Sequence, residues 1–484
     1  MYNTKYCISM PNKSKKCTYD SIIIVLSYCL NYSFHEQPIN SVVALIQFLY
    51  VFYLLIRGRV RESVYYHLLF ICTSISFPLS QFLSSGVANY GLYNYAKLKL
   101  FGPLSISFVI SLMFLIILFF KNVRLRIRTT TFLIISVCIF LIFIGIFSST
   151  LNIFLGNYVD TQSTIYYLVY LVNLIVYSFL ACFVFQSFCL RYQRGIYVLV
   201  LSAPLVACLG YIFGVNMIYG TVKVPVVTEA AYFYLIALIA INKELKISKG
   251  MLYASGFCWL LCLLSGALGG KGFIMVLLIL LALCMIRWRR SIILLILSLI
   301  FVIFLYQNIE ILYVFDGVQL AIYKLESALI LIHLLFFGGD LTLLPESPRI
   351  RVLEISMIVD TWSQSQWKAL LGSGFGGVFY DNFGYLSGLS LDTAYPMDEV
   401  MTNRFSRPHD MIPTVLHLHG MFGLILFFLL AFYFFVRSYT DLRYLVFIPF
   451  IVLSFYFNHQ FGLIAILFLS FNTLRIQRFN VTHN

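Results

Sequence analysis

The sequence predicts an all-α protein that crosses a membrane many times, because of its composition, its repeated apolar runs and the placement of its charges. Of the 484 residues, 61% are hydrophobic and only 11% are charged, and the mean hydropathy is +0.91. A water-soluble domain has an apolar share near half. Lipid is therefore expected to be the main solvent of this chain.

Apolar runs of about 15 to 25 residues recur along the whole sequence, enough to cross a hydrocarbon core of about 30 Å at 1.5 Å per residue. About fourteen spans are predicted in this way. They are 17–34, 41–56, 63–84, 103–120, 129–151, 163–187, 195–214, 225–242, 250–267, 272–286, 291–306, 411–436, 444–458 and 461–474. Three parts follow: an N-terminal bundle of about eleven spans (1–306), a large loop (307–410) and about three C-terminal spans (411–484).

Basic and acidic residues fall on opposite sides of the predicted membrane spans. Most of the 33 basic residues fall in connections on one side, and of the 19 acids only Asp20, Glu62, Glu244 and Asp441 join them there. By the positive-inside rule that side is the cytoplasm, so both termini are predicted inside and the 307–410 loop outside. The net charge of +14 thus indicates membrane orientation, and we expect no nucleic-acid partner.

The cysteines and the N-terminal segment indicate that the chain has neither a structural metal site nor a signal peptide that is removed. None of the eleven cysteines lies in the large loop, so a disulfide framework on the oxidising side is not expected. No Cys and His spacing resembles a zinc site, and no structural metal is expected. The polar N-terminal segment has no small-residue cleavage pattern after the first span, so that span is expected to remain.

The large loop is net acidic, yet its arginines come in two close pairs. The pairs are Arg349 with Arg351 and Arg404 with Arg407. The planar guanidinium matches phosphate oxygens with two parallel hydrogen bonds, so these residues are candidates for binding a pyrophosphate. Ordinary ion pairing with neighbouring acids is the alternative. Those acids are Glu346, Glu354, Asp398 and Asp410.

Lys271 is a lone cation in apolar surroundings at the predicted outer boundary of the span 272–286. Charge in that position is costly and is often functional, although a lysine can also extend its amine to the interface. Within the loop, the stretch 329–337 is apolar but too short to span. It predicts a helix that lies in the membrane interface or re-enters the bundle.

Two loop segments carry special residues. Gly372 and Gly374 lie in Leu371–Gly377 and predict a tight turn, without the lysine that a nucleotide-binding loop requires. His409 precedes a long apolar helix whose first turn contains Pro413. The free N–H groups of a helix start favour an anion, and an imidazole accepts a proton near neutral pH. His409 is therefore a candidate general base, with a purely structural hydrogen bond to Asp410 or to the backbone as the alternative.

Three segments, taken in order, resemble the O-antigen polymerase and O-antigen ligase superfamily of bacterial surface polysaccharide assembly. Leu268–Leu278, with Lys271, resembles the family's Ser-Arg-Gly segment, with lysine in place of arginine. Ser347-Pro348-Arg349 and the Gly372–Gly376 turn resemble the loop arginine and its Gly-x-Gly. His409-Asp410, followed by Leu416, Gly420 and Gly423, resembles the closing His-Asn, Leu and Gly-x-x-Gly motif, with aspartate in place of asparagine.

This resemblance implies a metal-independent glycosyltransferase without a cofactor, acting on undecaprenyl-pyrophosphate-linked oligosaccharide at the periplasmic face of the bacterial inner membrane. By the resemblance, His409 deprotonates the acceptor hydroxyl, while Lys271 and Arg349 neutralise the departing pyrophosphate. Arg351, Arg404 and Arg407 are secondary candidates for that anion. Membrane lipid and a chain-length regulator are the further partners that we consider.

Three functions remain open at this point. A polymerase joins repeat units on lipid carriers, and the long outer loop favours it. A ligase moves the finished chain onto a lipid A core. A transporter of lipid-linked oligosaccharide is less favoured, because we find no internal repeats in the sequence and, apart from Glu229 and Lys271, both near outer ends, the spans are nearly free of acidic and basic residues.

Overall fold

Helices dominate the fold, which we describe from a computed structural model of the chain. It describes residues 13–34, 39–75, 94–101, 104–186, 190–219, 222–241, 245–286, 316–363, 365–389, 395–454, 456 and 458–471. In the first half, the helices are α1 (Lys13–Ser33), α2 (Ile39–Ile56), α3 (Val60–Thr73), α5 (Ile106–Phe120), α6 (Thr129–Phe154), α7 (Thr161–Phe185), α8 (Leu190–Ile212), η2 (Glu229–Phe233) and α9 (Tyr234–Ala240). Two short antiparallel hairpins interrupt this half, β1 (Lys99–Phe101) with β2 (Leu104–Ser105) and β3 (Asn216–Tyr219) with β4 (Val222–Pro225).

The described part of the second half is mostly helical, with turns, irregular connections and one isolated β-bridge between Phe379 and Phe405. Its helices are α10 (Lys249–Leu264), α11 (Gly269–Ile286), α14 (Asp316–Phe337), η4 (Leu341–Leu343), α15 (Glu346–Ser363), α16 (Gln366–Leu371), α17 (Met397–Thr402), α18 (Met411–Ser438), η6 (Leu442–Val446), α19 (Phe447–Ser454) and α20 (His459–Leu469). The predicted fold class is confirmed in this coarse form, as a helical protein with apolar helices of membrane-spanning length.

Five of the described helices are long and apolar enough to cross a membrane. They are α2, α6, α7, α8 and α18, and they coincide with the predicted spans 41–56, 129–151, 163–187, 195–214 and 411–436. Other predicted spans correspond to shorter helices; α20, for example, has 11 residues. The span 291–306 lies outside the described residues, so the count of about fourteen stays a prediction.

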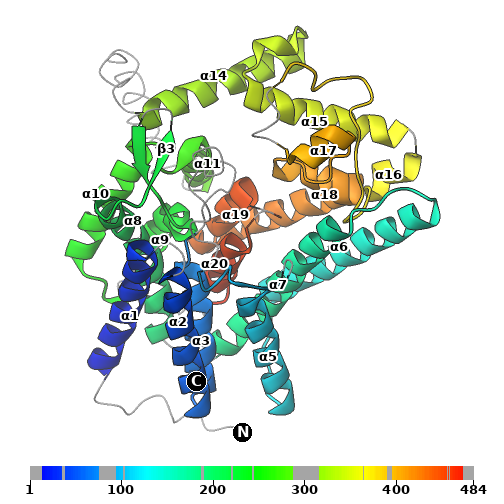
Figure 1. Cartoon of the computed structure of the whole chain (residues 1–484). Coiled ribbons are helices and arrows are strands. Elements are labelled where there is room, and N and C mark those ends of the chain that lie inside the picture. Colours follow the sequence, from blue (N-terminus) through cyan, green and yellow to red (C-terminus); the bar gives the residue numbers. More distant parts are fainter. Residues whose placement is uncertain are drawn as a thin grey trace.

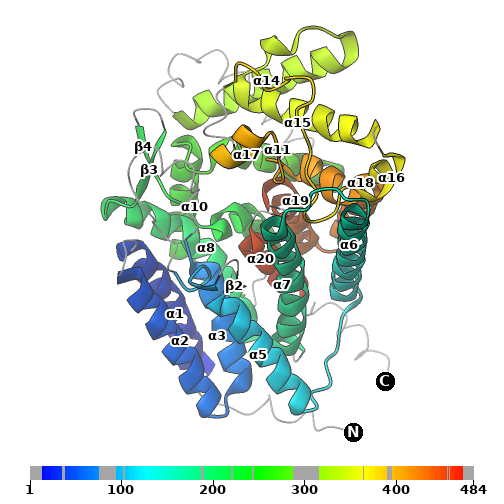
Figure 2. The same ribbon diagram turned by 45° about the vertical axis from the view of Figure 1, so that its right-hand side comes forward.

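The helices are arranged with the elements of residues 316–402 at one end. Figures 1 and 2 show α14, α15 and α17 at the top, together with the β3–β4 hairpin, while the α2–α3 turn and the end of α5 lie at the bottom. The stretch 329–337, predicted as a short interfacial or re-entrant helix, is the second half of α14. Much of the predicted large loop is thus helix rather than irregular chain.

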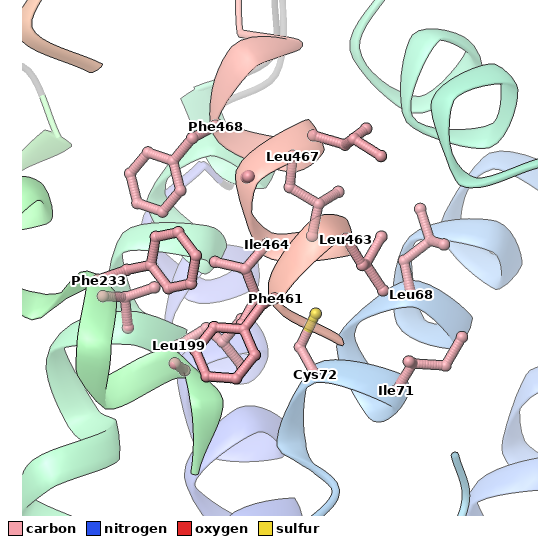
Figure 3. Packing of buried hydrophobic residues seen from close by; sticks show 14 of the residues in the cluster. Leu68, Ile71, Cys72, Leu199, Phe233, Phe461, Leu463, Ile464, Leu467 and Phe468 are labelled. Carbon is pink, nitrogen blue, oxygen red and sulfur yellow. The ribbon is translucent and has the colours of Figure 1, made fainter. Parts of the chain in front are cut away.

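A continuous apolar core holds the bundle together around α7, α8 and α20. Figure 3 shows Phe461 and Leu463 of α20 packed among Leu68 and Cys72 of α3 and Phe233 of η2. Gln460, at the start of α20, donates through Nε2 to the carbonyls of Ile71 and Ser74 at 2.7 and 3.1 Å. These bonds satisfy carbonyls at the C-terminal end of α3, which would be costly to leave unpaired in an apolar interior.

A second, smaller core forms within residues 341–416. Ile350, Leu353, Met357 and Ile358 of α15 pack against Phe379, Tyr395, Phe405 and Leu416, the last from the first turns of α18. The apolar positions of α15 recur at helical spacing and so form one stripe that faces this core. The core fixes α15 beside the start of α18, where His409 lies.

Candidate functional site

The candidate site forms where α15, the segment 403–410 before α18 and the start of α7 meet. Helix α15 packs against α16 and α18. Asp160 caps α7 by accepting from the backbone N–H groups of Gln162 and Ser163 at 3.1 and 3.0 Å. An aspartate cap satisfies N–H groups that have no partner within the helix. Ser163 and Tyr166 lie in the first two turns of α7, where both contact Arg407 of segment 403–410.

Glu354 of α15 binds His409 directly. The carboxylate is fully buried and the side chain of His409 is 25% exposed. The backbone N–H of His409 donates to both carboxylate oxygens at 3.2 Å, and the imidazole Nδ1 bonds Oε1. A buried carboxylate beside Nδ1 favours the tautomer with its proton on that nitrogen, a choice inferred from the hydrogen-bond network. The basic lone pair of the imidazole is then on Nε2.

Tyr395 completes this arrangement. Its hydroxyl donates to Oε1 of Glu354 at 2.5 Å, and its ring meets the His409 ring edge-on with centroids 4.6 Å apart. Burial, followed by the charge of Glu354, raises the pKa of Tyr395 well above its usual value. The phenol therefore stays a proton donor. It holds the carboxylate and the imidazole in one orientation.

The first arginine pair lies on α15 and is engaged by protein groups. Arg349 donates from Nε and Nη2 to the carbonyl of Leu344 at 3.2 and 2.9 Å, and from Nη2 to that of Thr342 at 3.2 Å. These bonds hold the turn before α15. Arg351 forms an ion pair with Asp410, with Nε and Oδ2 2.6 Å apart. Asp410, which follows His409, therefore joins the start of α18 to α15.

The second arginine pair lies against tyrosines near the start of α7. The guanidinium carbon of Arg404 is 4.7 Å from the ring centroid of Tyr158, and that of Arg407 is 5.5 Å from that of Tyr166. Arg407 also donates from Nε to Ser163 Oγ at 3.2 Å. A guanidinium stacked on an aromatic ring keeps its edge N–H groups for other acceptors. This pair is better arranged than Arg349 to meet an anion.

A hydrogen-bond chain connects Arg407 to a second carboxylate. Ser163 Oγ is 3.0 Å from Ser406 Oγ, which donates to Oε1 of Glu399 at 2.7 Å. Burial raises the pKa of Glu399, while the Ser406 hydrogen bond opposes that rise. The chain Arg407–Ser163–Ser406–Glu399 fixes the guanidinium from α7 on one side and from α17 on the other.

Gly372 and Gly374 form a turn that is packed against α6 and α18. Both have positive φ, +75° and +77°. The N–H groups of Ser373 and Gly374 donate to the carbonyls of His417 and Leu418 of α18 at 2.6 and 3.2 Å. Helix α18 departs from helical geometry at Gly420, with φ 59°. The turn therefore occupies the point where α18 is interrupted.

Lys271 lies in the first turn of α11, and its side chain is outside the described part of the structure. The fold therefore joins His409 to Glu354 and, through the neighbouring Asp410, to Arg351. It holds Arg404 and Arg407, on the segment before His409, against Tyr158 and Tyr166, and it uses Arg349 to shape the turn before α15. The predicted role of Lys271 stays a prediction.

Glu354 is the residue of the site that was not predicted from the sequence. From the sequence, Glu354 is one of four acids that could pair with a loop arginine, whereas in the structure it binds His409. A signal was present, because Ile350, Leu353, Met357 and Ile358 form an apolar stripe and Glu354 lies within it. A carboxylate in such a stripe is buried and needs a partner.

Within the described ranges, no three His, Cys, Asp or Glu side chains are grouped so as to hold a metal ion. Comparison of the chain with protein-family models, curated proteins and solved structures gave no match.

Proposed function

We propose that this protein is a glycosyltransferase that joins undecaprenyl-pyrophosphate-linked repeat units at the periplasmic face of the bacterial inner membrane, a surface polysaccharide polymerase. The observation that carries the proposal is the Glu354–His409 pair, with Arg404 and Arg407 held over tyrosine rings on the segment just before His409, at one end of an apolar helical bundle. An oriented histidine next to cationic groups suits attack by a sugar hydroxyl on a carbon that bears a pyrophosphate leaving group.

In the proposed reaction, Nε2 of His409 takes the proton of the acceptor hydroxyl as its oxygen bonds to the anomeric carbon of the donor sugar. The bond from that carbon to the pyrophosphate oxygen breaks, and undecaprenyl pyrophosphate leaves with the bonding electrons. The carboxylate of Glu354 stabilises the imidazolium through Nδ1, as a buried carboxylate does in other histidine pairs. His409 then loses its proton to solvent.

Charge on the departing pyrophosphate is met by Arg404 and Arg407 in this proposal, with Lys271 as a third cation. Guanidinium groups that are already fixed in place stabilise developing negative charge without a reorganisation cost. Arg351 keeps Asp410, and with it the start of α18, in register with α15. Arg349 supports the same geometry from the turn before α15.

Turnover by purified protein in detergent tests this function. We expect full-length protein supplied only with undecaprenyl-pyrophosphate-linked repeat units to produce dimers and longer oligomers on the carrier, and to release undecaprenyl pyrophosphate. Thin-layer or mass-spectrometric separation of the lipid-linked products measures both. Transfer seen only when a lipid A core is added would make the protein a ligase. No product with either acceptor, from protein that remains folded, would favour the transporter.

A further inference from the structure

Three cysteines meet between α8 and α10, away from the site described above. Helices α8 and α10 pack side by side (Figure 1). The Sγ atom of Cys208 in α8 is 3.8 Å from Sγ of Cys262 in α10, and the Cys208 thiol donates to the carbonyl of Cys258 at 3.6 Å. The two sulfur atoms are in van der Waals contact, so they are less than about 2 Å farther apart than the bonded sulfurs of a disulfide.

Both thiols lie near the ends of their helices, and the side of the membrane that these ends face determines whether the thiols can be oxidised. Cys208 is about one turn before the end of α8, and Cys262 is in the last turn of α10. The proposed topology directs both helix ends to the outer face, which in a bacterium is the oxidising side where disulfides form and persist. Cys262 is fully buried, while Cys208 is partly exposed. Cys208 is thus the thiol that an oxidant reaches first.

The absence of cysteines from the large loop argued against a disulfide framework, but Cys208 and Cys262 lie in helices, and we infer that they are a disulfide-forming pair that joins α8 to α10. The oxidant is a disulfide-bearing compound or protein of the outer compartment, written R–S–S–R. The Cys208 thiolate attacks one of its sulfurs, and R–SH leaves with a proton. The Cys262 thiolate then attacks the Cys208 sulfur of the mixed disulfide and releases the second R–SH. Two thiols are oxidised to one disulfide, and the two electrons and two protons are recovered in two R–SH.

The bond would secure the outer end of a helix that is otherwise held along one face. Tyr253 and Phe257 on the opposite face of α10 are 76% and 64% exposed. The chain runs from α10 through Ser265–Leu268 into the first turn of α11, which carries Lys271. A link between Cys208 and Cys262 would limit the movement of this connection. The inference goes beyond the proposed function and depends only on the orientation of the helices.

Peptide mapping under non-reducing conditions tests the inference without an activity assay. Full-length protein is collected from cells treated with N-ethylmaleimide, digested without reductant and analysed by mass spectrometry. We expect one cross-linked peptide pair containing Cys208 and Cys262, which disappears after dithiothreitol. The pair should persist in Cys258→Ser and be absent in Cys262→Ser. Recovery of both residues as alkylated thiols in the wild type, or a link from Cys208 to Cys258, would overturn it.

Thermal unfolding in detergent gives a second readout. A cross-link that closes the long segment between the two cysteines restricts the unfolded chain, so dithiothreitol should lower the Tm of the wild-type protein by several degrees. It should leave the Tm of Cys262→Ser unchanged. Cys138→Ser is the matched control, because this cysteine is also buried but lies in α6, and its variant should respond to dithiothreitol as the wild type does. Equal responses of wild type and Cys262→Ser would contradict the cross-link.

Discussion

His409→Ala is expected to lower the rate of repeat-unit joining by purified protein about 10²- to 10⁴-fold, the usual contribution of a positioned general base. The variant removes the imidazole, but the carboxylate of Glu354 still accepts hydrogen bonds from the Tyr395 hydroxyl and from the backbone N–H of residue 409. Initial rates of product formation on the lipid carrier measure the effect. Binding of the lipid-linked substrate should change much less, because the arginines are untouched.

Glu354→Gln tests the contribution of the carboxylate to the rate while the imidazole of His409 is kept. The amide is similar in shape but cannot stabilise an imidazolium, so the rate should fall about 10²- to 10⁴-fold while the protein remains folded. Glu346→Gln is the matched control, since Glu346 is an exposed glutamate in the first turn of the same helix, and its variant should keep the wild-type rate. A wild-type rate for both Glu354→Gln and His409→Ala would remove the pair from the mechanism.

Gly372→Ala is expected to destabilise the folded protein by more than about 3 kcal/mol, mostly through backbone overlap. A methyl group at this position would lie 2.3 Å from the backbone nitrogen of His419 and 2.4 Å from the carbonyl carbon of Leu418. These are backbone atoms at the interruption of α18, and they cannot move aside as the end of a flexible side chain can. The amount of inserted protein and its thermal unfolding in detergent measure the loss.

Gly388→Ala is the control for this variant. Gly388 has a similar φ of +79°, but an added Cβ would meet no atom within 4 Å. Only the backbone strain remains, which costs about 1–2 kcal/mol for a residue other than glycine. Similar losses for the two variants would show that strain, rather than the contact between the turn and α18, explains the need for Gly372.

Helices could be predicted from the sequence wherever apolar residues formed long uninterrupted runs. The runs 129–151, 163–187 and 411–436 correspond to α6, α7 and α18 within a few residues. Helix α14 was only half recognised, because Gln319, Lys324 and Glu326 occupy its first half and lower its hydropathy. Hydropathy reports the solvent around a segment more directly than its backbone conformation, so helices within residues 316–402 were missed.

Residue types were enough to select His409, since a histidine just before a helix start is a local pattern. Its partner could not be found in that way, because Glu354 is 55 residues away and only the packing of α15 on α18 brings the two together. The arginines show the same limit. Their chemistry indicates anion binding, but only the fold shows that Arg349 donates to backbone carbonyls while Arg404 and Arg407 stack on tyrosines.

The most direct test of a polymerase that acts through His409 is a gel of surface lipopolysaccharide. The cells lack their own copy of the protein and receive either the wild type or His409→Ala, with membrane insertion of both checked by immunoblot. We predict a ladder of chain lengths with the wild type, and core carrying a single repeat unit with the variant. An unchanged ladder with a normally inserted His409→Ala protein would contradict the proposed mechanism. Bare core with polymer retained on its lipid carrier would show a ligase instead.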